Sequence, residues 1–306
     1  MKPKTLLFIT AGDPLGIGPE VTVKALRYAQ LRTHSTPIII GDPAALQAAG
    51  WTEKLAALIP MQSLRPKPLR REPSAWGAEI SFKSLQLACK LAEAHPGSAV
   101  VTAPISKQSW TLAGIPFTGH TEFLREYYGK NALMMFVSGP LRCALVSEHF
   151  AIKDLPAVLT QKRIVHAARN FAAALQQLGR KHPRIGISAL NPHSGDNGKF
   201  GTEEKEVILP ALRALRRAHI FADGPYPVDA LWMAHRQGQF DGILCMYHDQ
   251  ALLGLKLAAT KPIVHITAGL DFLRTSPTHG TAFDIAGKNQ ADAGSMLAAL
   301  LFAAQR

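Results

Sequence analysis

Three histidines in this sequence stand directly after short apolar stretches, each among other polar side chains. His149 follows residues 143–146, His193 follows residues 184–190, and His248 follows residues 242–246. Apolar runs of this length are typical of strands buried on both faces, and open α/β sheets bind ligands at the carboxyl ends of their strands. Neutral imidazoles are common ligands of divalent metals. The repeated pattern favours convergence of the three on one divalent metal over three separate capped or solvated side chains.

A second candidate site lies at the start of a predicted helix. The segment that begins near residue 115 predicts a helix that runs to about residue 128, with His120 and Thr121 at its N-terminus. Free N–H groups and the helix dipole favour anions at such an end. We therefore expect an anionic ligand near His120 and Thr121.

The chain opens with a glycine-bearing turn between a predicted strand at 6–10 and a predicted helix at 21–30. Glycines at 12, 16 and 18 could cradle a phosphate, but the third glycine of the dinucleotide fingerprint is missing. A tight strand-to-helix turn is at least as good an interpretation.

The elements that must position these residues alternate between strand and helix. Strands are predicted at 6–10, 37–40, 99–104, 133–137, 142–146 and 263–267, and helices at 21–30, 44–49, 81–94, 161–178 and 291–303. We expect residues 64–72 and 274–282 to be loops and residues 223–229 to be a turn, with Asp229 capping a helix over 230–235. This alternation predicts a layered α/β fold with a mostly parallel sheet.

Composition bounds the class of protein. A chain of 306 residues, 47% of them hydrophobic, forms one large or two ordinary domains. Its 3 cysteines are far apart and sit among apolar residues, which predicts buried, reduced thiols in a cytoplasmic protein. The apolar start is too short for a secretion signal, and no apolar run is long enough for a membrane span.

The formal net charge of +12 calls for an anionic partner or a solvated surface. The basic residues are scattered and lack interleaved aromatic residues or a continuous basic helix, so we expect no binding to nucleic acid or membranes. Most of them are expected to be solvated, while a minority steers a phosphorylated or carboxylated small molecule inward.

Five motifs together resemble those of the 4-hydroxythreonine-4-phosphate dehydrogenase family of vitamin B6 synthesis. They are GDPLGIGPE at 12–20, GHTE at 119–122, NPHSG at 191–195, YHDQ at 247–250 and HGTAFDIAG at 279–287. They occur in the family's order and cover nearly the whole chain.

The resemblance implies NAD(P)-dependent, metal-requiring oxidation of 4-phosphooxy-threonine (4-hydroxy-L-threonine 4-phosphate). The resulting 3-keto acid decarboxylates to 3-amino-2-oxopropyl phosphate, on the route to pyridoxal 5'-phosphate. It also implies two α/β/α layered domains similar to those of isocitrate and isopropylmalate dehydrogenases. We expect residues 1–115 plus 286–306 in the first domain, and residues 116–285, with the metal ligands and the dimer interface, in the second. The implied assembly is a homodimer with a shared active site.

The same resemblance implies roles for individual residues. The expected metal ligands, shared between subunits and holding one zinc, magnesium or cobalt ion per site, are His149, His193, His248 and Asp229. The expected substrate-binding residues are His120, Thr121, Lys256, His265 and Arg274. Lys256 and Asp249 are the expected catalytic residues. Lys256 and Arg274 would neutralise phosphate or carboxylate charge.

Several positions depart from the family pattern. His265 stands where the family usually has a substrate-binding Asn, Thr278 replaces an Asp, and Glu148 replaces a Thr. A protonated His265 beside an anionic substrate would make affinity fall as pH rises, whereas a ring turned into the core would not. These departures keep catabolic relatives in view, which oxidise phosphorylated threonate or erythronate, another β-hydroxy acid or an aromatic dihydrodiol carboxylate. A metal-dependent hydrolase with Asp249 or Glu148 as base, and a catalytically inactive relative, also remain open.

Overall fold

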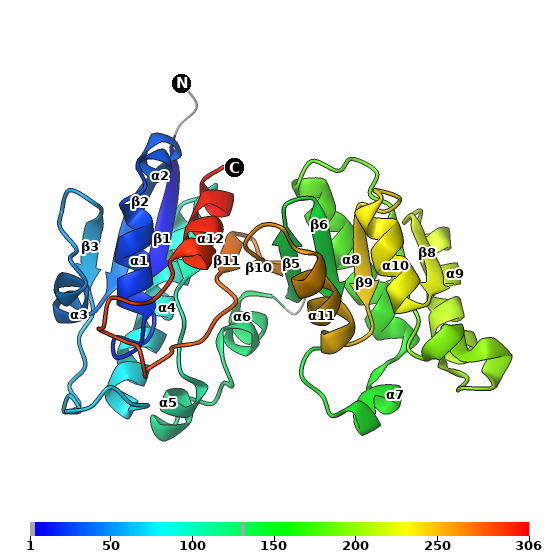
Figure 1. Cartoon of the computed structure of the whole chain (residues 1–306), viewed down its shortest axis with the longest axis horizontal. Coiled ribbons are helices and arrows are strands. Elements are labelled where there is room, and N and C mark those ends of the chain that lie inside the picture. Colours follow the sequence, from blue (N-terminus) through cyan, green and yellow to red (C-terminus); the bar gives the residue numbers. More distant parts are fainter. Residues whose placement is uncertain (1–3, 130–131, 306) are drawn as a thin grey trace. The chain divides into compact units, whose positions relative to one another are not determined.

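The computed structural model describes residues 4–129 and 132–305, and it divides into two compact units. Unit 1 comprises Met1–Tyr128, Val264–Ile266 and Leu270–Arg306, and unit 2 comprises Gly129–Ile263 and Thr267–Gly269. Each unit is a layered α/β structure (Figure 1). Residues 116–128 and 270–285, expected in the second domain, therefore fall in unit 1. Strand β10 (Val264–Ala268) contributes residues to both units.

The sheet of unit 1 is parallel in every strand pair described here. Its order is β3-β2-β1-β4-β11, with β1 (Thr5–Thr10) at the centre. The other strands are β2 (Ser35–Gly41), β3 (Ala57–Pro60), β4 (Ala99–Thr102) and β11 (Leu273–Ser276). Central strands of a parallel sheet are covered on both faces, which explains the continuous apolar sequence of β1.

Helices cover both faces of this sheet. Helix α12 (Gly294–Ala304) contacts β1, β4 and β11 and packs on α1 (Gly18–Leu26), while α4 (Ala75–Ala94) contacts β1, β2 and β4 from the other side (Figure 1). The remaining helices of unit 1 are α2 (Ala29–His34), α3 (Pro43–Ala48), α5 (Lys107–Leu112) and α6 (His120–Tyr128). Side-chain caps from Asp42, Ser74 and Ser106 begin α3, α4 and α5.

The sheet of unit 2 has the order β5-β6-β9-β7-β8. Strands β5 (Leu133–Ser138) and β6 (Leu141–Leu145) form an antiparallel hairpin, and the other pairs are parallel. The parallel strands that follow are β7 (Ile185–Ser188), β8 (Ala222–Tyr226) and β9 (Gly242–Cys245).

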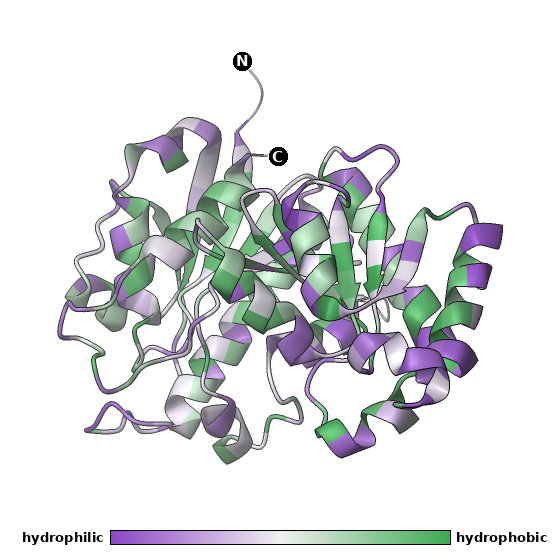
Figure 2. Cartoon of the chain, turned by 45° about the vertical axis from the view of Figure 1, so that its right-hand side comes forward, coloured by the Kyte–Doolittle hydropathy of each residue, from purple (hydrophilic) through white to green (hydrophobic). Residues whose placement is uncertain are grey.

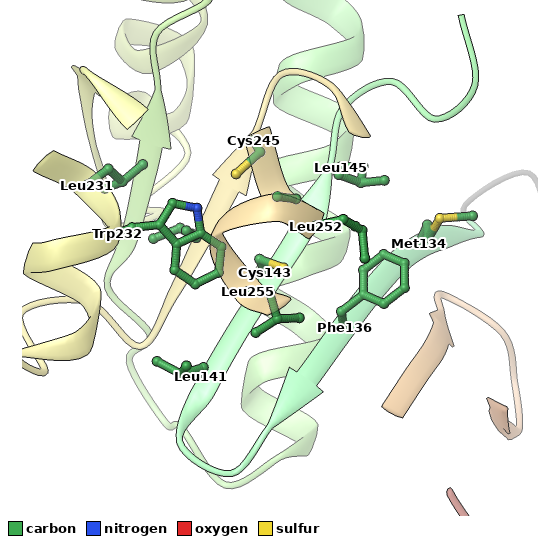
Figure 3. Close-up of a cluster of buried hydrophobic side chains, with 12 residues drawn as sticks. Met134, Phe136, Leu141, Cys143, Leu145, Leu231, Trp232, Cys245, Leu252 and Leu255 are labelled. Atoms are coloured by element: carbon green, nitrogen blue, oxygen red, sulfur yellow. The ribbon is translucent and has the colours of Figure 1, made fainter. Parts of the chain in front are cut away.

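Two helix layers cover the sheet of unit 2. A Cβ at Gly242 would meet Phe171 of α8 (Gln161–Gln177), whereas the next residue, Ile243, joins a core cluster with Leu231 of α10 and Leu255 of α11 (Figure 3). Successive residues of a strand point to opposite faces, so α8 covers one face and α10 (Val228–Arg236) and α11 (His248–Ala258) the other. The remaining helices are α7 (Leu155–Val158) and α9 (Leu209–Arg217).

Most of the predicted elements are confirmed, and three local expectations are wrong. Residues 222–226 form strand β8 rather than a turn, and residues 273–276 form strand β11 rather than a loop. Helix α10 begins at Val228 with Pro227 before it, so Asp229 lies inside the first turn and does not cap the helix. Proline suits this end because it lacks the N–H that a helix start leaves unbonded.

Hydropathy follows the layers. Apolar residues concentrate on the strands and on the helix faces toward them, while hydrophilic residues occupy the outer helix faces and the loops (Figure 2). Within residues 4–129 and 132–305, no helix combines the length and the apolar character that crossing a bilayer requires.

Candidate active site

Parallel pairing brings the ends of β6 and β9 together in unit 2. The register pairs Leu145 with Cys245, and two further backbone bonds continue it, from Val146 N to Cys245 O at 2.9 Å and from Ser147 N to Met246 O at 3.1 Å. The buried Ser147 hydroxyl also donates to the Met246 carbonyl at 2.6 Å. The residues that follow each strand therefore emerge side by side.

His149 and His248 are the neighbours that this register produces. Their ring centroids lie 5.5 Å apart. Two imidazoles bound to one ion, with metal–nitrogen distances of about 2.1 Å, place their centroids roughly 5 Å apart at a tetrahedral angle. His248 Nδ1–H donates to Asp249 Oδ1 at 2.7 Å, which leaves the Nε2 lone pair available as a ligand. The Asp249 side chain is 73% exposed.

Gln250, in the first turn of α11, ties the end of β9 to the end of β7. Its Oε1 accepts from Ser188 Oγ and from Met246 N, both at 2.9 Å, and its Nε2 donates to Ala189 O at 2.8 Å. The Gln250 side chain is buried, so these bonds are shielded from water. The His193 loop, which continues from β7, is thus linked to the start of the helix that carries His248.

His193 lies in an unusual left-handed turn. Residues 193–198 all have positive φ, between 42° and 98°, and four of them, His193, Ser194, Asp196 and Asn197, are not glycine. Left-handed backbone at residues other than glycine costs roughly 1–3 kcal/mol each and persists only where the surroundings enforce it. His193 itself is exposed.

The other expected residues of unit 2 lie apart from this pair. Asp229 is exposed in the first turn of α10, and Lys256 is exposed two turns after Asp249, on the same face of α11. Across the part of the chain that the structure describes, no three or more His, Cys, Asp or Glu side chains are grouped so as to hold a metal ion. Within one chain, His149 and His248 are therefore neighbours. Neither His193 nor Asp229 joins them as a third metal ligand among the described residues.

Unit 1 contains a buried arginine. Arg274 on β11 is 1% exposed, its Nη2 donates to Thr102 Oγ1 at 2.6 Å, and its Nη1 donates to His265 Nδ1 at 3.2 Å. Burial lowers the pKa of Arg274 to about 10. A buried guanidinium supplies a positive charge and N–H donors, an arrangement that suits a phosphate or carboxylate ligand.

Two histidines accompany Arg274. His265 Nδ1 lies 3.2 Å from Ser276 Oγ as well as from Arg274, so the ring turns toward the arginine. His120 begins α6 as expected, its ring packs edge-on against Trp110, and its buried Nε2 has no hydrogen-bond partner among residues 4–129 and 132–305. Burial, with smaller contributions from the charges of Arg274 and His265, holds the pKa of His120 well below 6.5. His120 is therefore neutral near pH 7.

The glycine-bearing turn after β1 lines a cavity of about 330 Å³ in unit 1. Gly16 and Gly287 contribute backbone, and the basic side chains that line it are Lys24, Arg27 and Arg71. Asp13 fixes the turn, because its carboxylate accepts hydrogen bonds from Leu15 N at 3.1 Å and from Ser109 Oγ at 3.0 Å. Burial raises the pKa of Asp13.

Sequence reasoning assigned no role to Thr102, Gln250 or Glu204. Thr102 and Gln250 each lie where an apolar stretch is followed by polar residues, a pattern that could have predicted a role at the end of a strand. Glu204 carries no such local signal, because its partners lie 13 and 14 residues earlier in the chain.

Comparison with known proteins follows the same motifs. The model of the family described as pyridoxal phosphate biosynthetic protein PdxA matches residues 25–303. A 4-hydroxythreonine-4-phosphate dehydrogenase from Erythrobacter litoralis is 39% identical, and the match covers 99% of this chain and 97% of that protein.

Solved structures show the same relationship. The crystal structure of 4-hydroxythreonine-4-phosphate dehydrogenase from Klebsiella pneumoniae superposes with a TM-score of 0.87 at 31% identity, covering 100% of this chain and 99% of that one. Isocitrate dehydrogenase from Methylococcus capsulatus shares the fold, with a TM-score of 0.50 at 18% identity over 99% of this chain and 85% of that one. The expected isocitrate dehydrogenase-like α/β architecture is confirmed. This chain belongs to the pyridoxal phosphate biosynthetic protein PdxA family.

Proposed function

We propose that this protein oxidises 4-phosphooxy-threonine with NAD or NADP, and that the 3-keto acid product loses carbon dioxide to give 3-amino-2-oxopropyl phosphate. In the oxidation the carbon that bears the substrate's secondary hydroxyl gives a hydride to the nicotinamide ring, and the hydroxyl itself gives a proton to a base. The observation that carries the proposal is the buried guanidinium of Arg274, which lies beside Thr102 and His265 in a chain of this family. Its charge and N–H donors suit an anionic substrate.

Arg274, His120 and Thr121 would bind the substrate's anionic group. The guanidinium supplies charge and N–H donors, and the start of α6 adds backbone N–H groups. A neutral His120 can donate one N–H to an oxygen without adding charge. His265 would hold the guanidinium in place through its Nδ1 lone pair.

His149, His193 and His248, with Asp229, would hold one divalent ion in a site completed by a second subunit. The pairing of His149 with His248 and the Asp249 carboxylate behind His248 fit such a site. A bound divalent ion would polarise the oxygen of the substrate's hydroxyl group and of the later ketone. Zinc, magnesium and cobalt remain the candidate ions.

Lys256 is the residue to which we assign proton transfer, because the Asp249 carboxylate is already engaged by His248. The expected result for Lys256→Met is a fall in kcat with a smaller change in KM. A similar loss in Asp249→Asn with full activity in Lys256→Met would reverse this assignment.

The cavity beside the glycine-bearing turn would take a phosphate-bearing part of NAD or NADP. Arg27 and Arg71 supply positive charge, whereas Lys24 is paired with Glu20 of the same lining at 2.9 Å. Arg27→Gln should then weaken cofactor binding measured by fluorescence titration. Unchanged dissociation constants for both NAD and NADP would place the cofactor elsewhere.

The deciding experiment follows absorbance of the reduced nicotinamide with a panel of substrates. 4-Phosphooxy-threonine should give the highest kcat/KM, ahead of phosphorylated threonate and erythronate and of an aromatic dihydrodiol carboxylate. Release of inorganic phosphate without any nicotinamide reduction would instead identify a hydrolase.

A further inference from the structure

The left-handed turn that carries His193 is held by one buried carboxylate. Glu204 is 5% exposed, and its Oε1 accepts from Leu190 N at 2.9 Å and from Asn191 N at 2.8 Å. Its Oε2 accepts from Asn191 Nδ2 at 3.0 Å. Both carboxylate oxygens are thus used by the two residues that lead from β7 into the turn.

The same carboxylate lies against the turn itself. A Cβ built on Gly195 would stand 2.7 Å from Glu204 Oε2, so the Gly195 backbone rests on the carboxylate. Gly195 has φ +79°, which glycine adopts without strain. Two further bonds close the turn, from Ser194 Oγ to Pro225 O at 3.1 Å and from Phe200 N to Gly195 O at 3.1 Å.

An irregular helix positions Glu204 against the turn. It is the first residue of a π-helical segment, Glu204–Ile208, that runs directly into α9. The wider π turn is rare, and it occurs mostly as single turns at functional sites. Ile208 of this segment is buried, which fixes the segment against unit 2.

We infer that Glu204 is the positioning residue of the His193 turn, fixing the left-handed backbone that presents the imidazole to a divalent ion. The inference rests on the proposed function for the role of His193 as a ligand. The fixing of the turn itself does not depend on any ion.

Glu204→Gln is the sharpest test. Glutamine keeps the size of the side chain but replaces one acceptor oxygen with an NH₂ group, which cannot accept a hydrogen bond. Either the two backbone N–H groups or the Asn191 amide must then lose its acceptor. Glu203→Gln is the matched control, because Glu203 is less buried and makes one described contact, to Asn191 Nδ2 at 2.7 Å.

Two measurements separate the inference from the proposed function. Amide hydrogen exchange of residues 190–201, in protein without metal, should speed up at least tenfold in Glu204→Gln and change little in Glu203→Gln. Titration with Co²⁺ should show a dissociation constant raised tenfold to a hundredfold in Glu204→Gln alone, the range typical of groups that orient metal ligands.

A second pair of variants changes the contact between Gly195 and the Glu204 carboxylate from the side of the turn. It provides the test if Glu204→Gln does not fold. Gly195→Ala pushes a methyl group into Glu204 Oε2. Gly198→Ala also places alanine at a positive φ, +98°, but nothing lies within 4 Å of its Cβ. Faster exchange and weaker Co²⁺ binding in Gly195→Ala but not in Gly198→Ala support the inference.

Unchanged exchange in both Glu204→Gln and Gly195→Ala would overturn it. Faster exchange with unchanged Co²⁺ affinity would overturn the link to the ion. Absence of Co²⁺ binding in the wild-type protein would contradict the proposed metal site, while the exchange data would still decide whether Glu204 holds the turn.

Discussion

At the residue scale the proposed function depends most on Arg274, a buried cation that donates hydrogen bonds to Thr102 and His265. Burying a guanidinium costs free energy of folding, and an anionic ligand would offset part of that cost. Stability and substrate binding should therefore respond in opposite ways when the charge is removed.

Arg274→Met tests this separation. Methionine fills a similar volume without a charge, so the melting temperature should stay constant or rise. kcat/KM should fall about tenfold to a hundredfold, because a charge-assisted hydrogen bond is worth about 1.5–3 kcal/mol. Arg274→Lys, which keeps the charge, is the control and should lose less. A large drop in melting temperature with kcat/KM unchanged would give Arg274 a structural role.

His120 allows a prediction about pH and stability. The pKa of His120 in the folded protein is held well below 6.5. As pH falls below about 6.5, His120 therefore takes up a proton in the unfolded chain but not in the folded protein. Stability should therefore decrease as pH is lowered from about 6.5. In His120→Asn this decrease should be shallower in melting curves measured between pH 7.5 and pH 5.

His235 is the control for that measurement. Its pKa is also lowered, chiefly by burial. Its Nε2 accepts a hydrogen bond from Arg142 N, and its Nδ1 donates one to Phe240 O. Part of the decrease in stability at acid pH should therefore remain in His120→Asn. Identical slopes in wild type and variant would show that His120 is not neutral in the folded protein.

Among the elements, the ends of β7 and β9 and the start of α11 behave as one assembly through Gln250. The His248 side chain sits at the start of α11, and the His193 turn leaves β7. The buried Gln250 amide therefore extends the direct pairing of β7 and β9 to the segments from which these two histidines emerge.

Gln250→Met should destabilise the protein by about 1–3 kcal/mol, because Ala189 O loses its donor and the Ser188 hydroxyl loses its acceptor in a buried place. Urea unfolding measures this change. Gln239→Met is the matched control, since Gln239 is exposed and its side-chain amide makes one described hydrogen bond, to Gln237. Equal midpoints for the two variants would remove Gln250 from the framework of the site.

At the scale of the whole molecule, the proposed homodimer is supported by exposed apolar side chains on two helices of unit 2. On α11, Leu253 is 63% and Leu257 is 81% exposed, and Met233 of the contacting helix α10 is 55% exposed. Large apolar side chains at high exposure on adjoining helices are typical of interaction surfaces. We propose that a second copy of the chain covers them.

Mixing inactive variants tests whether subunits share the site. His149→Ala, His193→Ala and His248→Ala should each be inactive alone. If one of these histidines is donated by the partner, two of the three pairwise mixtures should recover activity after refolding together. Random pairing makes half of the dimers mixed, each with one intact site of two, so about a quarter of wild-type activity is expected. Recovery in none of the mixtures would place every ligand in one chain.

The sequence by itself determined the α/β class, most strands and helices, and the motifs that identify the family. These features depend on residues within a few positions of one another, where apolar periodicity, proline and glycine act directly. It misassigned residues 273–276, because a four-residue strand containing a buried arginine resembles a polar loop.

Only the tertiary structure decided which side chains meet. Arg274 and Thr102 are 172 residues apart in the chain, and neighbouring parallel strands bring them into contact. The left-handed turn at His193 depends on the Glu204 carboxylate, a contact that no local pattern encodes. Because such contacts arise from strand order and backbone conformation, the residue types at the site could be predicted from the sequence, whereas their partners could not.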